Sequence, residues 1–340
     1  MSIGLVVVRS AEPADLTADR VKHLLSRSWR VEVDRVTYAA VGHGSYHWIA
    51  YRGNTPTWFV TGDRIAGKRL TELDASARLA AALTDAGFAF VVAPVPDKAG
   101  QLVHIVEPDW AVQVLPYVSG SSSNQGEWSG SNWADPIEQT RVAGMVGRLH
   151  AQPAPEFVPP WDPTPPHWAK LNAALHVVGV KPSSRPGFSQ RTHATLCEHR
   201  GRILALIDRY HLLVREANSD RNSWVLTHGE PDSDNVIRTG DGRLFLIDWT
   251  TAAVAPRERD LFDVMQGPED ITLAYQEAAG PHPPRPRALE MIGLHWRLSH
   301  LGHDLDLLLH PDGEPPERIE RAWERFLERL ETPPGTYSFH

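Results

Sequence analysis

The chain has 340 residues, of which 41% are hydrophobic and 22% are charged, and its formal net charge is −8 at pH 7. This is a globular composition, and the length suits one large domain or two lobes of roughly 100–200 residues. The acidic balance argues against a general nucleic-acid-binding protein, which would carry a basic surface. The single cysteine, Cys197, excludes an internal disulfide, and no apolar run reaches the roughly 20 residues that span a bilayer. We therefore expect a cytoplasmic protein without nucleic-acid or membrane partners, and the sequence leaves the oligomeric state open.

The first 115 residues alternate short strands with helical segments. Helices are predicted over 15–30 and 75–86, and strands over 31–36, 48–51, 57–61, 88–93, 102–107 and 111–115. A turn of small residues, which includes Gly42, Gly44 and Ser45, separates the first two strands. This pattern predicts an α+β lobe.

The rest of the chain is mainly helical. Residues 120–132 are rich in Ser, Gly and Asn and are expected to form a loop, and the seven prolines in residues 152–166 predict irregular structure. Asp135 and Pro136 indicate a helix start, as N-cap and first helical residue. Further helices are expected over 189–217, 256–278, 286–310 and 315–331, with short strands over 224–227 and 244–247.

Polar side chains stand where these two strands end. The first strand runs into His228 and Glu230, Asn235 follows a few residues later, and the second strand ends at Asp248. Phosphoryl transfer from ATP needs such a set. One carboxylate orients or deprotonates the attacking hydroxyl, while an amide oxygen and a second carboxylate hold magnesium against the phosphates. The order and spacing are those of a kinase catalytic loop.

The same segment resembles the aminoglycoside phosphotransferase family, whose loop reads His-Gly-Asp-x-x-x-x-Asn before Ile-Asp-Trp or Ile-Asp-Phe. The stretch Ala255–Leu261 and the helix end Gly147–His150 also fit, and residues 224–262 are the most specific part. The resemblance implies a protein-kinase-like bilobal fold. Residues 1–115 would form a nucleotide-binding lobe with an antiparallel sheet and one helix, and residues 116–340 a larger, mainly helical catalytic and acceptor-binding lobe. It also implies ATP or GTP with Mg²⁺, and a small hydroxylated acceptor such as an antibiotic, so the expected enzyme is a resistance kinase.

The resemblance assigns roles to individual residues. Glu230 takes the place of the catalytic aspartate, His228 braces the loop by hydrogen bonds, Asn235 and Asp248 are magnesium ligands, and Asp260 anchors the loop backbone. The nucleotide-binding candidates are Gly42, Gly44, Ser45, Leu115 and Lys68. The acceptor-binding candidates are Asp232, Asp234, His300, His303 and Asp304.

Two positions depart from the family pattern. Glu230 is one methylene longer than aspartate, but the two carboxyl groups have similar reference pKa values and can do the same proton chemistry. Thr61 stands where the third strand should carry the lysine that contacts the phosphates, so we expect Arg64 or Lys68 to reach the phosphates instead.

Other interpretations of these motifs are less favoured. Residues 62–69 nearly spell a Walker A loop, but Arg69 replaces the magnesium-binding Ser or Thr, which favours a solvated turn. The histidines at 295, 300 and 303 could hold a metal, and a metal-dependent hydrolase is a weak alternative. The main rival is a catalytically inactive protein of the same fold that sequesters a nucleotide or drug. The retained Asn235 and Asp248 favour a kinase over it.

Overall fold

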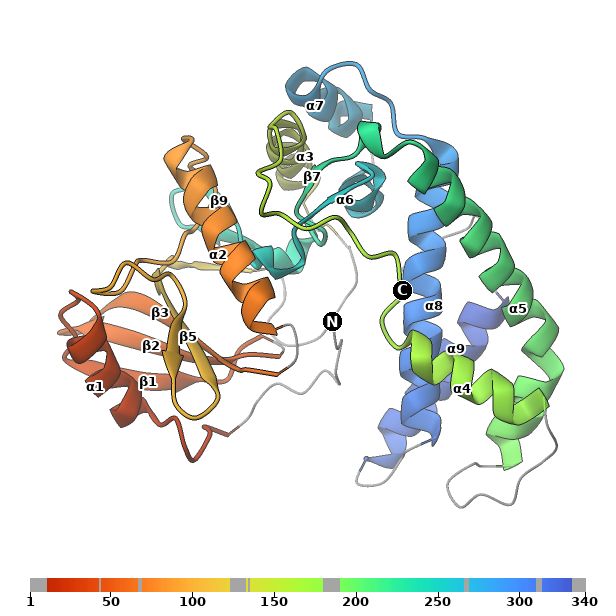
Figure 1. Cartoon of the computed structure of the whole chain (residues 1–340), viewed down its shortest axis with the longest axis horizontal. Helices are drawn as coiled ribbons and strands as arrows, with labels where there is room; N and C mark the ends of the chain where they lie inside the picture. The colour runs from red at the N-terminus through yellow and green to blue at the C-terminus, as the bar shows by residue number, and fades with distance from the viewer. Residues whose placement is uncertain are drawn as a thin grey trace. The chain divides into compact units, whose positions relative to one another are not determined.

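The computed structural model describes residues 11–42, 44–66, 69–122, 133, 135–179, 190–265, 269–309 and 314–331. These residues fall into two compact units (Figure 1). The sheet unit covers the described parts of Gly4–Pro160 and Val225–His282, and the helical unit those of Trp161–Trp224 and Pro283–Ser338. The lobe boundary predicted after residue 115 divides the chain differently and stays a prediction. Within the described residues, none of the helices combines the length and the apolar character needed to cross a bilayer.

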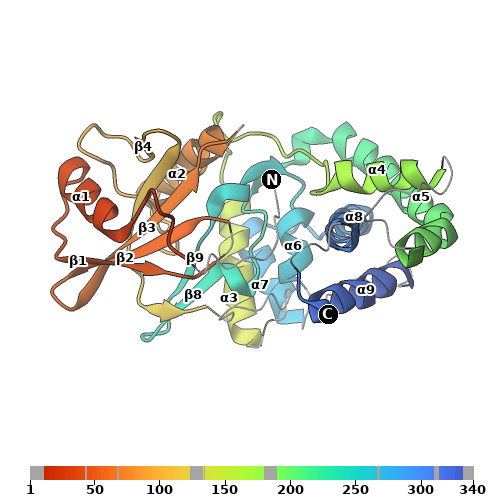
Figure 2. The same cartoon turned by 90° about the horizontal axis from the view of Figure 1, so that it is seen from below.

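A five-stranded antiparallel sheet, in the order β1–β2–β3–β5–β4, opens the sheet unit. Its strands are β1 (Arg35–Ala39), β2 (Tyr46–Arg52), β3 (Thr55–Arg64), β4 (His104–Val106) and β5 (Trp110–Pro116). Helices α1 (Ala18–Ser28) and α2 (Arg69–Asp85) cover opposite faces (Figure 2). Alternation along β5 explains this arrangement, because Val112 packs in the core cluster of α1 whereas Ala111 packs with Leu73 of α2.

The strand predicted over 88–93 is wrong. This segment makes only an isolated bridge between Val91 and Leu246, and Phe88 and Phe90 instead fill the core of the sheet unit. Pro94 and Pro96 follow immediately and lack the N–H groups that a ladder requires.

The second half of the sheet unit contains all but the first of residues 224–262, the segment predicted to include the catalytic loop. Its elements are β6 (Gly120–Ser121), α3 (Pro136–His150), β7 (Val225–Thr227), β8 (Val236–Thr239), β9 (Leu244–Leu246), β10 (Ala253–Ala255), α6 (Glu258–Val264) and α7 (Glu269–Ala279). Asp135 caps α3 as predicted, accepting a hydrogen bond from the backbone N–H of Ile137 at 2.9 Å. Helix α3 packs very closely on α7, since a Cβ at Gly147 would lie 2.6 Å from the Tyr275 carbonyl oxygen. The single helix predicted over 256–278 is two helices, α6 and α7.

The helical unit consists of α4 (Trp168–Gly179), α5 (Gln190–Ser219), α8 (Pro286–Leu309) and α9 (Pro316–Glu331). Helix α4 was not predicted, whereas the other three lie within a few residues of their expected ranges. Asp304 of α8 is only 1% exposed and accepts hydrogen bonds from Arg325 at 2.9 Å and from Arg329, both on α9. This buried ion-pair group fixes α8 to α9.

Candidate active site

The carboxylate of Asp260, on α6, holds the backbone of the loop that follows β7. Its Oδ2 accepts a hydrogen bond from the His228 N–H at 2.8 Å, and its Oδ1 one from the Gly229 N–H at 2.7 Å. Burial by itself would raise the pKa of Asp260, but the hydrogen bond to His150 and the nearby Arg259 hold it below its ordinary value. The carboxylate is therefore ionised at neutral pH, and both bonds to the loop are charge-assisted.

Asp260→Asn should damage both stability and activity. An amide has one acceptor oxygen, so its NH₂ group would face a backbone N–H that now lacks a partner. We expect a loss of about 1–3 kcal/mol in the free energy of unfolding and a roughly 10²-fold fall in turnover, because the loop moves. Urea unfolding and steady-state kinetics measure the two effects. Asp74→Asn is the control, since its half-exposed pair with Arg78 should contribute under about 0.5 kcal/mol. Equal effects of the two substitutions would contradict the anchoring role.

His228 bridges the loop and the end of β9 as a neutral imidazole. Its Nε2 lies 2.9 Å from the Ile247 carbonyl oxygen, and the Glu230 N–H points to its Nδ1 at 3.4 Å. Burial lowers the pKa of His228. A neutral ring protonated on Nε2 satisfies both contacts, donating to the carbonyl and accepting from the N–H. The imidazole therefore positions the loop, and no proton transfer is needed to explain its place.

Arg259 is a residue of the loop environment that the sequence analysis missed. Its guanidinium is buried and donates to the Thr227 hydroxyl at 3.1 Å. A Cβ at Gly229 would lie 2.3 Å from it, and Gly229 has a φ of +106°, so both space and backbone conformation require glycine there. Its sequence signal was its place in the stretch Ala255–Leu261, immediately before Asp260, but no role was assigned to it there.

The three main candidates lie next to the short strands: Glu230 follows β7, Asn235 precedes β8 and Asp248 follows β9. Asn235 donates its Nδ2 to the Glu230 carbonyl oxygen at 2.8 Å, which leaves its carboxamide oxygen as the acceptor for a ligand. Asp248 has φ 59° and ψ 70°, a left-handed conformation that Asp and Asn tolerate better than most residues. Its carboxylate is exposed and caps the short 3₁₀ helix Trp249–Thr251 through Thr250.

Several carboxyl groups around the loop raise one another's pKa values. Burial and the charge of Asp248 raise the pKa of Glu230 to about 7. Burial, Glu230 and Asp234 raise that of Asp232 to about 8, and burial also raises the pKa of Asp263 on α6 well above its ordinary value. Such crowded negative charge is relieved by a bound cation.

The oxygen donors of Asn235 and Asp248 fit Mg²⁺, which prefers oxygen ligands. Within the described part of the chain, no group of three or more His, Cys, Asp or Glu side chains is arranged to hold a metal ion. A site with one amide and one carboxylate is nevertheless consistent with Mg²⁺, because this ion usually keeps several waters and takes other ligands from substrate phosphates.

Four of the five predicted nucleotide-binding residues lie on the five-stranded sheet or in the turn between β1 and β2. Gly42 and Gly44 both have positive φ values in the turn between β1 and β2. The hydroxyl of Ser45, at the end of that turn, donates to Asp63 Oδ1 at 2.7 Å. Leu115 lies on β5 opposite Phe59 of β3. Lys68 lies outside the described residues.

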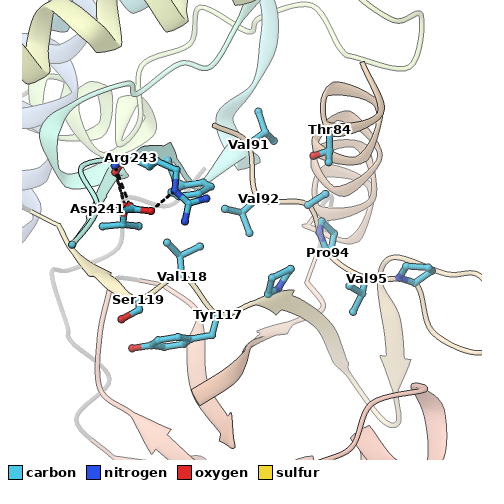
Figure 3. Close-up of a pocket in the computed structure, with 16 residues that line it drawn as sticks. Thr84, Val91, Val92, Pro94, Val95, Tyr117, Val118, Ser119, Asp241 and Arg243 are labelled. Carbon is cyan, nitrogen blue, oxygen red and sulfur yellow. Dashed lines mark hydrogen bonds and ion pairs between the residues drawn. The ribbon is translucent and has the colours of Figure 1, made fainter. Parts of the chain in front are cut away.

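A cavity of about 820 Å³ in the sheet unit is lined by none of these residues, although it reaches Pro116, the neighbour of Leu115. The cavity is lined by Val91–Pro96, by Pro116–Ser119 and by the turn of the β8–β9 hairpin. Figure 3 shows Val92 and Val118 among these residues, together with the Asp241–Arg243 ion pair. That turn is the end of the hairpin opposite Asn235 and Asp248. The cavity is therefore not the predicted phosphate site.

The five acceptor-binding candidates do not form one described cluster. In the sheet unit, Asp232 accepts hydrogen bonds from the N–H groups of Asp234 and Asn235 at 3.0 and 3.1 Å, so it shapes the loop. In the helical unit, His303 packs against His167 with ring centroids 5.3 Å apart, and His300 stacks on Trp296. Asp304 is buried in its ion pairs with α9, as described above. Acceptor binding by these residues stays a prediction.

Comparison with known proteins agrees with this geometry. Residues 39–292 match the phosphotransferase enzyme family. Protein StrN of Streptomyces griseus is 25% identical over 275 residues, which cover 74% of this chain and 75% of StrN.

Solved structures show the same fold. Spectinomycin phosphotransferase in complex with ADP and spectinomycin aligns with a TM-score of 0.70 and 15% identity, over 93% of this chain and 95% of its own. A microcompartment-associated aminopropanol kinase aligns with a TM-score of 0.64 and 15% identity, over 92% and 95%. The protein-kinase-like fold is thereby confirmed. Because residues 39–292, most of its length, match the family model, the chain belongs to the phosphotransferase enzyme family.

Proposed function

We propose that this protein transfers the γ-phosphoryl group of ATP to a hydroxyl group of a small molecule. The observation that carries the proposal is the loop held by Asp260, in which the backbone of Glu230 is fixed between His228 and Asn235. A catalytic group must be held within a fraction of an ångström to be effective, and these bonds provide that constraint.

In the proposed mechanism Glu230 accepts a hydrogen bond from the acceptor hydroxyl and takes its proton as the new P–O bond forms. The bond from the γ-phosphorus to the β–γ bridging oxygen breaks at the same time, and ADP leaves with that oxygen. Its raised pKa makes the carboxylate a stronger base than an ordinary glutamate. Asn235 and Asp248 would hold Mg²⁺, which supplies neutralisation of the phosphate charge when bound. The chain itself contributes mainly positioning, because phosphoryl transfer needs little covalent chemistry from the protein.

The acceptor is proposed to be a hydroxylated antibiotic, which would make the protein a resistance kinase. The support is the structural likeness to spectinomycin phosphotransferase, and an amino alcohol is the alternative that the likeness to aminopropanol kinase suggests. The acidic side chains near Glu230 also suit an acceptor that carries amino groups.

A nucleotide-consumption screen tests the function. The purified protein is incubated with ATP or GTP, Mg²⁺ and single members of a panel of spectinomycin, aminoglycosides, macrolides and amino alcohols. We expect nucleoside diphosphate to form only with the true acceptor, and mass spectrometry to show one added phosphate on it. Binding of a compound without any phosphorylated product across the panel would instead support the sequestering alternative.

A further inference from the structure

Strand β3 supplies no positive charge to the face of the sheet that α2 covers. Thr61, Phe59 and Asp63 share this face because they alternate along the strand. Gln113, opposite Thr61 on β5, reaches the Leu73 carbonyl oxygen of α2, which identifies the face. The Thr61 hydroxyl is buried and has no hydrogen-bond partner among the described residues.

The imidazole of His47 occupies the space beside Thr61. His47 is directly opposite Thr61 on β2 and stacks on the Phe59 ring, with centroids 5.0 Å apart and planes at 24°. A Cβ at Gly42 would lie 3.3 Å from its Nε2, so the ring sits beneath the turn that carries Gly42. Burial lowers the pKa of His47 to about 4 despite the charges of Asp63 and Asp248, so the ring is neutral at pH 7.

The guanidinium of Arg64 is engaged by other residues, away from Thr61. Its guanidinium bonds Asp109 at 2.8 Å and Asp15 at 2.7 Å, and it lies over the Trp110 ring at 4.1 Å from the centroid. Arg64 alternates with Asp63 along β3 and therefore points to the opposite face of the sheet. The expectation that Arg64 reaches the phosphates does not fit this geometry.

Arg69, the first residue of α2, places a guanidinium on the face of the sheet that carries Thr61 and Asp63. Its Nη2 and Nε donate to Asp63 Oδ1 at 2.7 and 3.2 Å, and the same oxygen accepts the Ser45 hydroxyl at 2.7 Å. Asp63 is 7% exposed, whereas the Arg69 side chain is 24% exposed. One buried carboxylate therefore ties the guanidinium to the turn between β1 and β2 and leaves part of it accessible.

We propose that Arg69, held by Asp63, is the cation that contacts the nucleotide phosphates in this protein. In protein kinases a lysine on the third strand pairs with a glutamate on the helix that follows, and the two charges are exchanged here. Asp63 on β3 is the carboxylate, and Arg69 on α2 is the cation. Asp63 acts as a positioning residue, since it reaches the nucleotide only through Arg69. This inference rests on the proposed function, because it needs a nucleotide in the site.

Binding of ATP and of adenosine, each in the presence of Mg²⁺, separates the phosphate contribution from that of the base. Isothermal titration should show Arg69→Gln weakening ATP about 10–100-fold while leaving adenosine affinity unchanged. Arg69→Lys keeps the charge but loses the two-pronged bond to Asp63, so it should recover part of the ATP affinity. Unchanged adenosine binding also shows that the variant is folded.

The matched control is Arg64→Gln, which removes the same charge from the other face of the sheet. This variant should keep the wild-type ratio of ATP affinity to adenosine affinity. Arg69→Gln with wild-type ATP affinity would overturn the inference, as would an equal loss for Arg64→Gln and Arg69→Gln. Failure of the wild type to bind ATP at all would count against the proposed function itself. If Arg69→Gln does not fold, Arg69→Met, which also removes the charge, is measured in its place, and a wild-type ratio of ATP affinity to adenosine affinity in that variant overturns the inference.

Discussion

Asp248→Asn is expected to lower turnover by about 10³-fold or more, which corresponds to roughly 4 kcal/mol. It should also abolish the dependence of nucleotide binding on Mg²⁺. The substitution removes the one carboxylate among the two proposed magnesium ligands but keeps an oxygen that can accept the bond from Thr250. Asparagine also tolerates the left-handed conformation at this position, so the backbone should stay in place. Isothermal titration with a non-hydrolysable ATP analogue, with and without Mg²⁺, measures the effect.

Asp248→Ala should lose the same function with an added cost of about 1 kcal/mol, because alanine is disfavoured at positive φ. Comparing the two variants separates the lost charge from backbone strain. The unfolding free energy should fall for the alanine variant and change little for the asparagine variant. Nucleotide binding of equal strength with and without Mg²⁺ in the wild type would count heavily against a kinase.

Glu230→Gln should lower turnover by about 10²–10⁴-fold, the range that general-base catalysis contributes. The lower end is expected, since a loose phosphoryl-transfer transition state needs little early proton removal. Acceptor affinity should change far less than turnover, because the lost interaction belongs to the transition state. Kinetics with the true acceptor at saturating ATP provide the measurement, and full turnover in this variant would exclude Glu230 as the base.

The pH dependence gives an independent readout of the same residue. Glu230 acts as a base only when ionised, so wild-type turnover should fall as the pH drops through its pKa. Bound Mg²⁺ would neutralise Asp248, one cause of the raised pKa, and should move this fall below pH 7. The acid limb should be absent in the residual activity of Glu230→Gln.

Glu230→Asp restores the residue typical of the family, yet turnover should fall. The loop is shaped around the longer side chain, and a shift of about 1 Å in a positioned group can cost about 10²-fold. Higher turnover in Glu230→Asp would show that the loop does not constrain the carboxylate.

Regular patterns in the sequence predicted most of the fold. The Asp135 cap, the paired strands of the first lobe and the long C-terminal helices each have strong local signals. The strand prediction over 88–93 was wrong because the apolar residues of this segment pack in a core cluster. Hydrophobic periodicity alone cannot distinguish such a segment from a buried strand. The single helix expected over 256–278 failed because the apolar pattern continues through both α6 and α7.

The loop proposed as catalytic could be recognised in the sequence because its residues are close together along the chain. The Asp63–Arg69 pair was not, since an aspartate at the end of a strand and an arginine at the start of a helix are common surface residues. Their meaning depends on alternation along β3 and on the turn that brings Ser45 to the same oxygen. Thr61 in place of the expected lysine indicated that another cation should contact the phosphates, but it did not indicate the position of that cation.

The order of the helices along the chain has a consequence for folding during synthesis. Helices α4 and α5 pack on α8. The ribosome makes Val225–His282, which belong to the other unit, after α5 and before α8. At about 5–20 residues per second, the 24 residues of α8 alone take about 1–5 s to emerge. During that time the faces of α4 and α5 that pack on α8 stay uncovered, and the buried apolar residues of these helices include Leu171 and Ile203. A chain that stops before Pro286 would keep this apolar face in water permanently, so exposed hydrophobic surface, and not only lost activity, is the direct result of truncation there.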